Sequence, residues 1–175
     1  LANIFRSFLT DVFLLFNNSA FYYRPILTIS LIFDYQIGNI SPFIYHFTNI
    51  ILHITSSYLI YVFLSKLNYE KTLAFLFSII FLVHPVLTQA VAWIPGRNDS
   101  LLAIFALSTF IFFIKYLKNK KIKNLIFSLI FFALSIFTKE SGIFILPIMF
   151  FFLYFIYKKE NKEVTSAPTK ASVYK

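Results

Sequence analysis

Long hydrophobic runs fill most of this sequence, and short polar or charged stretches separate them. No residue between Ser41 and Ser65 is formally charged, and a helix needs about 20 apolar residues to cross the hydrocarbon core of a bilayer. Ser41 and Pro42 favour a helix start, because serine is a good N-cap and proline fits the first helical position. The pattern predicts a first spanning helix over residues 41–65, ended by Lys66.

Further hydrophobic runs predict four more spanning helices, over residues 72–83, 100–116, 124–137 and 143–157. His84-Pro85 ends the first of these, because proline lacks a backbone N–H and clashes with the preceding turn. Residues 86–94 are therefore predicted to continue that span as a short kinked segment. A loop follows, in which Asn98 or Asp99 is expected to cap the next helix.

The first 40 residues are apolar but interrupted too often to supply a spanning helix. Asn3–Phe16 and Ile26–Ile37 are instead predicted to form two helices that lie along the membrane surface. The chain begins with neither an initiator Met nor a signal-like stretch, so we expect an internal piece of a longer protein. The fold class is all-α integral membrane: residues 1–40 form an external loop, residues 41–159 the transmembrane domain, and residues 160–175 a disordered cytoplasmic tail.

Composition and charge support this interpretation. Of the 175 residues, 59% are hydrophobic and 13% are charged, whereas soluble domains carry about a quarter charged residues. The net charge of +9 does not indicate nucleic-acid binding, because most basic residues fall on one side of the predicted spans. Lysine-rich connections stay in the cytoplasm, so Arg6, Arg24, Arg97 and Lys139 are expected on the external side. There is no cysteine, which excludes a cysteine metal site.

Several polar residues recur at helical spacing along the first predicted span, where the bilayer disfavours them. His46, Asn49 and His53, with Ser56 or Ser57, would form one stripe, which should face other helices or a wet cavity. For Asn49 and His53 the favoured interpretation is hydrogen bonding to neighbouring helices. For His46, which lies nearer the external surface, packing and a role in a site remain equal alternatives.

The ionic residues expected on the external side could form a binding site. They are Arg24, Asp34, His84, Arg97, Asp99, Lys139 and Glu140. A cationic cluster beside an apolar groove suits a lipid-linked phosphate, and Asp99 and Glu140 are candidates to coordinate a divalent cation or to accept a proton. From the residues alone the simpler interpretation, salt bridges of Arg97 with Asp99 and of Lys139 with Glu140, is preferred. The triplets Asn17-Asn18-Ser19 and Asn98-Asp99-Ser100 match the N-glycosylation pattern, which often arises by chance.

Three segments together resemble one family. They are Tyr22-Tyr23-Arg24-Pro25 with its continuation through Phe33-Asp34-Tyr35 to Leu52-His53, the run His84-Pro85-Val86-Leu87-Thr88-Gln89-Ala90-Val91-Ala92-Trp93-Ile94-Pro95-Gly96-Arg97-Asn98-Asp99, and Phe137-Thr138-Lys139-Glu140-Ser141-Gly142 with Pro147. The second is similar to the signature HPxHTEAVAxIxGRxD, although Leu87 replaces a His and Gln89 a Glu. The family has a GT-C glycosyltransferase core and includes the transmembrane-and-tetratricopeptide O-mannosyltransferases; no such repeat is present in this sequence.

The resemblance implies transfer of a sugar from a polyprenyl- or dolichyl-phosphate donor to a protein or glycan acceptor. The reaction would take place on the external face of a bacterial inner membrane, or on the lumenal face of the endoplasmic reticulum. The acidic pair of GT-C enzymes would lie upstream of Leu1. Under this hypothesis the phosphate is bound by Arg24, Arg97 and Lys139 with a hydrogen bond from His84, whereas Asp99 and Glu140 are catalytic candidates and Asp34 and His46 are supporting residues.

A second hypothesis is a non-enzymatic membrane scaffold or a segment of a transporter, which would use the polar stripe for packing or permeation. A transporter places ionisable groups near the middle of the bilayer. Here the formal charges fall at the ends of the predicted spans, which favours chemistry at the membrane surface.

Overall fold

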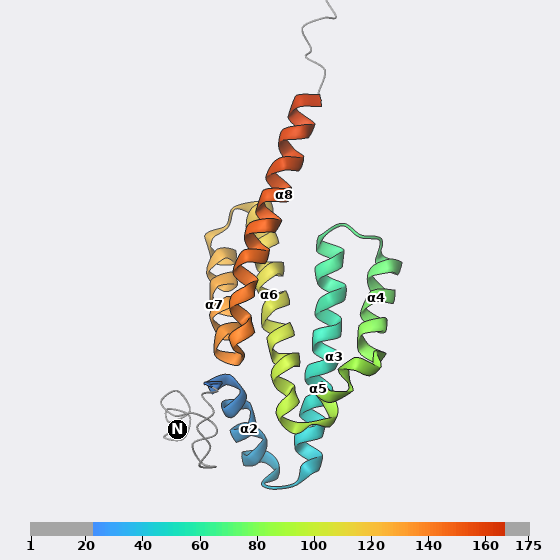
Figure 1. The fold of residues 1–175 in the computed structure, drawn as a ribbon, viewed down its shortest axis with the longest axis vertical. Coiled ribbons are helices and arrows are strands. Elements are labelled where there is room, and N and C mark those ends of the chain that lie inside the picture. Colours follow the sequence, from blue (N-terminus) through green and yellow to red (C-terminus); the bar gives the residue numbers. More distant parts are fainter. Residues whose placement is uncertain (1–22, 167–175) are drawn as a thin grey trace, which may run out of the picture. The chain divides into compact units, whose positions relative to one another are not determined.

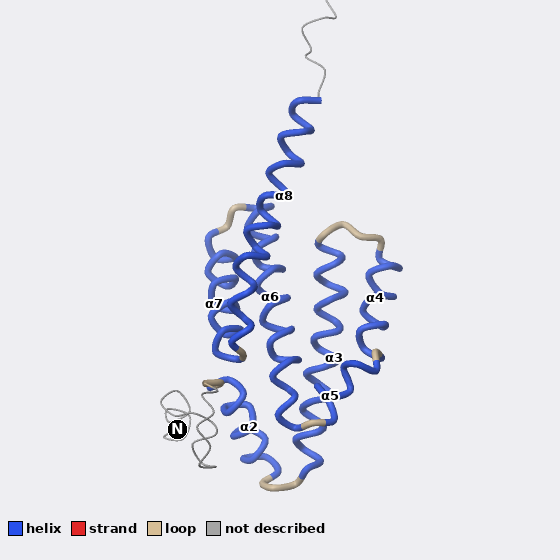
Figure 2. The backbone as a smooth tube through the Cα atoms, in the orientation of Figure 1, coloured by secondary structure: helices blue, strands red, loops and turns tan. Residues whose placement is uncertain are grey.

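The computed structural model describes residues 23–166, with side chains up to Phe155, and within that range every regular element is helical. The chain divides into two compact units, Leu1–Ile143 and Phe144–Lys175. Figures 1 and 2 show the order of the elements. They are α2 (Pro25–Gly38), α3 (Pro42–Lys66), α4 (Lys71–Val83), η2 (Pro85–Leu87), α5 (Thr88–Ala92), η3 (Ile94–Gly96), α6 (Arg97–Asn119), α7 (Ile122–Thr138), η4 (Glu140–Phe144) and α8 (Ile145–Ser166).

Two helices of the described part are long and apolar enough to cross a membrane, Pro42–Lys66 and Ile94–Asn119. The segment Pro85–Ala92 follows α4 and is bent by 51° against it. If α4 and this segment are counted together as one span, the number of possible spans rises to three. The predicted all-helical membrane architecture is confirmed to this extent, whereas five spans and the surface position of α2 stay predictions. The predicted helix Asn3–Phe16 lies outside the described residues.

Helix α4 and the segment Pro85–Ala92 return the chain from the end of α3 to the start of α6. The ends of α3 and α6 lie together, because Lys118 Nζ donates a hydrogen bond to the Lys66 carbonyl at 3.1 Å. Both helices therefore run in the same direction, as Figure 1 shows, and the chain between them must run back along their length. Helix α7 runs antiparallel to α6, since Lys139 after its end contacts Asp99 in the first turn of α6.

The polar stripe of α3 satisfies backbone carbonyls along the broken span. His53 Nε2 lies 3.0 Å from the Leu82 carbonyl. That carbonyl lacks its usual partner, because the Val86 N–H donates instead to His84 Nδ1 at 3.2 Å. One turn further along α3, Ser57 Oγ donates to the Ser78 carbonyl at 2.7 Å. A helix can break at membrane depth only where other groups bind the freed backbone.

Asn49 serves the same purpose at the end of α5. Its Nδ2 lies 3.1 Å from the carbonyl of Val91, 3.2 Å from that of Trp93 and 3.4 Å from that of Ile94. Val91 lies in the last turn of α5, and its carbonyl would otherwise pair with an N–H that Pro95 lacks. The carbonyls of Trp93 and Ile94 also accept the backbone N–H groups of Gly96 and Arg97. The prediction that Asn49 and His53 bond to neighbouring helices is confirmed.

Helix α6 begins earlier than the sequence suggests. The 3₁₀ turn η3 leads directly into it, with Gly96 as the N-cap and Arg97 as the first helical residue. A Cβ at Gly96 would overlap the Gln89 carbonyl, so the close contact with α5 requires glycine. The prediction that Asn98 or Asp99 caps this helix is wrong, because both lie inside its first turn.

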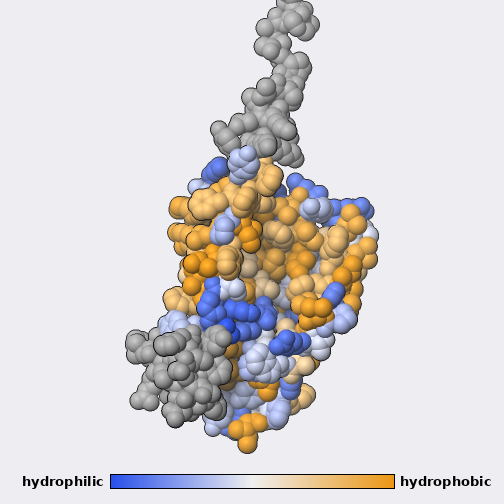
Figure 3. All heavy atoms as spheres, in the orientation of Figure 1, coloured by the Kyte–Doolittle hydropathy of each residue, from blue (hydrophilic) through white to orange (hydrophobic). Residues whose placement is uncertain are grey.

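Hydrophobic side chains cover the middle of the α3–α4 hairpin, and hydrophilic side chains gather at the loop between the two helices (Figure 3). A second hydrophilic patch lies where α7 ends and α2 begins. In the second unit, α8 continues to Ser166, so residues 160–166 of the expected disordered tail are helical. Lys and Glu favour helix, which allows the helix to extend past its apolar part. The remainder of that tail lies outside the described residues.

Candidate functional site

Three ion pairs join three parts of the first unit within the described residues. They are Asp34–Arg97, Asp99–Lys139 and Arg24–Glu140. The first links α2 to α6, the second links α6 to the turn after α7, and the third links that turn back to α2. We call these six residues the ion-pair ring. The ring contains every ionic residue that the sequence suggested for the site, except His84.

The partners differ from those expected as simple salt bridges. Arg97 pairs with Asp34 rather than Asp99, and Lys139 pairs with Asp99 rather than Glu140, so the predicted pairings are wrong. Residues two apart on a helix do not face each other, which separates Arg97 from Asp99. Lys139 has an extended backbone between α7 and η4, and its neighbour Glu140 turns towards Arg24.

The Asp34–Arg97 pair is enclosed. The side chain of Arg97 is 0% exposed and that of Asp34 is 4% exposed, with 2.5 Å between Nη1 and Oδ2. Arg97 also donates to the carbonyls of Ser30 at 3.4 Å and Tyr45 at 3.0 Å. Thr48 Oγ1 donates to Asp34 Oδ1 at 2.8 Å. The sequence reasoning missed Ser30, Tyr45 and Thr48 as partners, because two contribute only backbone atoms and a threonine in an apolar run is unremarkable.

The other two pairs reach the surface, and we call them the outer pairs. Arg24 binds Glu140 with two parallel contacts, Nη2 to Oε2 at 2.9 Å and Nε to Oε1 at 3.3 Å. Lys139 Nζ lies 2.5 Å from Asp99 Oδ1. The side chains of Asp99 and Glu140 are 51% and 53% exposed, so an anion from outside could compete with them for the two cations.

A tight turn places Lys139 and Glu140. Helix η4 folds back onto the last turns of α7, and a Cβ at Gly142 would lie 2.6 Å from the Ser135 carbonyl oxygen. Only glycine allows the two backbones to approach this closely. The Lys-Glu-Ser-Gly sequence therefore combines two ionic residues with the glycine that fixes their turn.

The pKa of Glu140 is lowered from its usual value of 4.5. Partial burial acts to raise this pKa, but the hydrogen bond from Arg24, a hydrogen bond from its own backbone N–H and the charges of Arg24 and Lys139 together outweigh burial. Because the folded-state pKa lies below the unfolded-state pKa, the ion pair stabilises the fold above the unfolded value, and this stabilisation is lost as pH falls through the folded value.

We expect Glu140→Gln to lower the thermal midpoint of the protein in detergent at about pH 6, and to have a smaller effect at about pH 3, where a larger fraction of the wild-type carboxyl is protonated. Unfolding curves of the two proteins at both pH values test this. A difference in midpoint that is equal at both values would contradict the lowered pKa.

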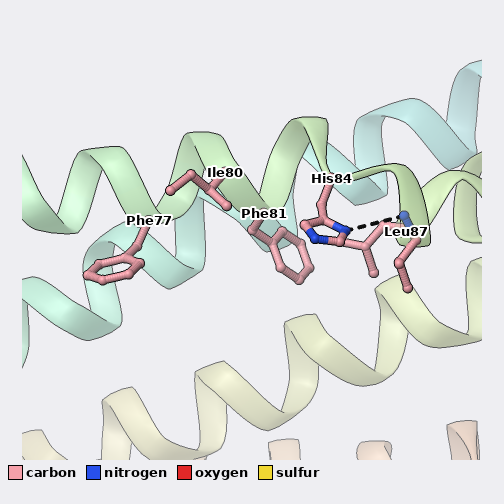
Figure 4. A pocket seen from close by; sticks show the side chains of 6 residues that line it. Phe77, Ile80, Phe81, His84 and Leu87 are labelled. Carbon is pink, nitrogen blue, oxygen red and sulfur yellow. Dashed lines mark hydrogen bonds between the residues drawn. The ribbon is translucent and has the colours of Figure 1, made fainter.

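His84 lies apart from the ion-pair ring. Its ring, exposed on one side, lies between Phe81 and Leu87 beside an apolar groove of about 300 Å³, also lined by Phe77, Ile80 and Val86 (Figure 4). In the described part, no hydrogen bond or ion pair joins His84 or the half-buried His46 to the ion-pair ring. The structure thus brings together six of the eight predicted site residues.

Two other sequence expectations concern metal binding and modification. Within the described residues, no group of three or more His, Asp or Glu side chains is placed to hold a metal ion, and Asp99 and Glu140 each face a cation. Asn98 is 5% exposed in the first turn of α6, so its amide is not accessible for glycosylation. The other triplet, residues 17–19, lies outside the described residues.

Comparisons with known proteins agree with the resemblance noted in the sequence. Residues 25–172 match the family described as dolichyl-phosphate-mannose-protein mannosyltransferase. Protein O-mannosyl-transferase F38B6.6 of Caenorhabditis elegans is 37% identical over 135 residues, which is 75% of this chain and 19% of that protein.

Relatives in other animals are also similar. Protein O-mannosyl-transferase TMTC2 of Mus musculus is 33% identical over 98 residues, 56% of this chain and 12% of that protein. Protein O-mannosyl-transferase Tmtc1 of Drosophila melanogaster is 26% identical over 143 residues, 82% of this chain and 17% of that protein. The chain spans about a fifth or less of the length of these curated relatives. No solved structure matches it. Since the family match covers most of its residues, the chain belongs to the dolichyl-phosphate-mannose-protein mannosyltransferase family.

Proposed function

We propose that this chain is part of an integral membrane enzyme that transfers mannose from dolichyl-phosphate mannose to a protein. The reaction takes place on the lumenal face of the endoplasmic reticulum, or on the external face of the membrane. Family membership and the printed activities of the relatives, which are named protein O-mannosyl-transferases, support the reaction. In this proposal the chain has five spans, and α2 lies along the external membrane surface.

The separation between the ion-pair ring and the lysine-rich end carries the proposal. Arg97 in the first turn and Lys118 in the last turn of α6 are about 32 Å apart along the helix axis. The hydrocarbon core of a bilayer is about 30 Å thick. If the lysine-rich end lies in the cytosol, the ring lies in the opposite headgroup layer. A lipid-linked phosphate occupies that layer.

The outer pairs suit the chemistry of this donor. Arg24 and Lys139 can exchange their carboxylate partners for the donor phosphate, because guanidinium and ammonium groups bind both kinds of anion. The bond between the mannose C1 and the phosphate oxygen then breaks, and a bond forms between C1 and the acceptor oxygen. In this scheme Asp99 or Glu140, released from its cation, accepts the proton of the acceptor hydroxyl, and dolichyl phosphate leaves with the electrons of the broken bond. Arg97 is enclosed and His84 faces a separate groove, so neither contacts the phosphate in this scheme.

The test is the effect of Lys139→Ala on the full-length protein in membranes. We expect the KM for dolichyl-phosphate mannose to rise about tenfold, because one cation is lost from the phosphate site. The initial rate of mannose transfer against donor concentration gives the KM. Lys123→Ala is the matched control, since Lys123 is exposed at the opposite end of α7, and it should leave the KM unchanged.

A charge swap separates phosphate binding from a purely structural ion pair. Asp99→Lys combined with Lys139→Asp keeps a cation facing a carboxylate but moves the cation from the turn to α6. We expect the swapped enzyme to retain the raised KM. If the swap restores wild-type kinetics, Lys139 serves only to pair with Asp99 and is no phosphate ligand. If the wild-type protein transfers no mannose from this donor, the proposed function fails.

A further inference from the structure

We infer that Asp34 and Arg97 are positioning residues, whose buried ion pair holds α2 so that Arg24, near the opposite end of that helix, reaches the turn containing Lys139 and Glu140. This inference rests on the proposed function, in which Arg24 binds the donor phosphate. It gives Arg97 a different task from the phosphate contact that the sequence suggests.

The guanidinium of Arg97 connects three helices. It contacts α2 twice, at the Asp34 carboxylate and at the Ser30 carbonyl one turn before, and it contacts the Tyr45 carbonyl on α3. It also lies over the Tyr45 ring, 5.9 Å from the ring centre. Arginine suits this task because its planar, rigid fork fixes the directions of several hydrogen bonds at once.

A lipid phosphate has no route to this guanidinium in the structure. The Arg97 side chain is 0% exposed and its carboxylate partner is 4% exposed. By contrast, Arg24 and Lys139 are partly exposed, and their partners are about half exposed. Burial therefore separates one internal pair, which sets geometry, from the outer pairs, which can exchange ligands.

The geometry of α2 makes Arg24 sensitive to the buried pair. Arg24 precedes Asp34 by ten residues, which corresponds to about 15 Å along a helix. A tilt of about 10° at Asp34 would move Arg24 by about 2.5 Å over that length. Its contacts to Glu140, at 2.9 and 3.3 Å, would not survive such a displacement. The buried pair thus controls a contact that lies far along the same helix.

The position of α2 can be measured independently of activity. Tyr23 and Phe137 lie edge to face with their ring centres 6.4 Å apart, and they join the start of α2 to the end of α7. Cysteines at these two positions in the full-length protein, linked by a short bis-maleimide, report whether this end of α2 is in place. The present chain has no cysteine of its own that could react with the crosslinker.

The test compares single and double variants in this cysteine background. We expect Asp34→Leu and Arg97→Met each to lower the crosslinking yield severalfold and to raise the donor KM about tenfold with little change in kcat of the inserted enzyme. The double variant removes both charges, so no uncompensated charge stays buried. Because it also lacks every contact from the Arg97 guanidinium to α2 and α3, its crosslinking yield should stay low and its KM should stay raised. Recovery of both would show that the pair is not needed to position α2.

Each alternative outcome has a distinct meaning. Recovery of crosslinking without recovery of KM in the double variant would show that Arg97 itself binds the donor, which overturns the inference and leaves the proposed function intact. Undiminished crosslinking in both single variants would show that the pair does not hold α2. If the double variant does not insert into membranes, Arg97→Lys decides: lysine keeps the charge but cannot make all three contacts, so wild-type crosslinking and KM in that variant would also overturn the inference.

Discussion

Replacing Arg97 by methionine is expected to lower the free energy of unfolding in detergent by about 3–5 kcal/mol, because the Asp34 carboxylate is then buried without a compensating charge. Methionine fills much of the space of the arginine stem, so the loss comes chiefly from the charge and its hydrogen bonds. Unfolding in mixed micelles, followed by circular dichroism or by intrinsic fluorescence, measures the effect.

The matched control for this prediction is Arg24→Met. Arg24 also pairs with a carboxylate, but Glu140 is half exposed, and exposed ion pairs contribute only about 0–1 kcal/mol. Equal losses in the two variants would show that burial of the Arg97 pair has no energetic consequence. A loss that persists when Asp34→Leu is added to Arg97→Met would indicate that shape, rather than the unpaired carboxylate, causes the destabilisation.

The second large effect is expected for Asn49→Leu, which should cost about 2–3 kcal/mol, because a buried carbonyl deprived of its partner loses about 1–3 kcal/mol. Asn49 Nδ2 is within hydrogen-bond distance of the carbonyls of Val91, Trp93 and Ile94, and leucine offers none of these contacts. The same unfolding measurement applies. Hydrogen exchange of residues 88–96 should also accelerate, since α5 and η3 lose their attachment to α3.

Thr55→Val is the control for Asn49→Leu. Thr55 lies on the same helix, but its hydroxyl bonds only to the Ile51 carbonyl one turn before it, and such local bonds contribute little to helix stability. We expect a change near zero. An Asn49→Leu variant as stable as Thr55→Val, with unaltered exchange in residues 88–96, would contradict the assignment of Asn49 to the broken span.

The sequence predicts elements best where one local signal dominates. The start of α3 follows from Ser41-Pro42, and the break after α4 follows from His84-Pro85, because proline constrains the backbone independently of its surroundings. The start of α6 was misplaced, since a 3₁₀ turn before a helix leaves little trace in hydrophobic periodicity. Helical spacing also showed that Asn49 and His53 share a face, but not which carbonyls they bind, because those belong to a segment some 30 to 45 residues away.

The candidate site shows the limits of sequence more clearly. Its ionic residues are visible as charges at the ends of hydrophobic runs, but their pairing depends on where α2 lies, which no local pattern specifies. Neighbours in sequence, such as Lys139 and Glu140, therefore looked like partners although each binds a residue from another helix. Burial is equally hidden, and it distinguishes Arg97 from Arg24 and Lys139, which resemble it in charge and position.

The hydrogen bonds from α3 to the broken span also constrain how this family can vary. An asparagine or histidine in a spanning helix is tolerated only while a neighbouring backbone offers it carbonyls, and the interruption at His84-Pro85 supplies them. In relatives whose second span is continuous, positions 49 and 53 should carry apolar residues. An interruption in one helix thereby determines which polar amino acids the neighbouring helix can carry.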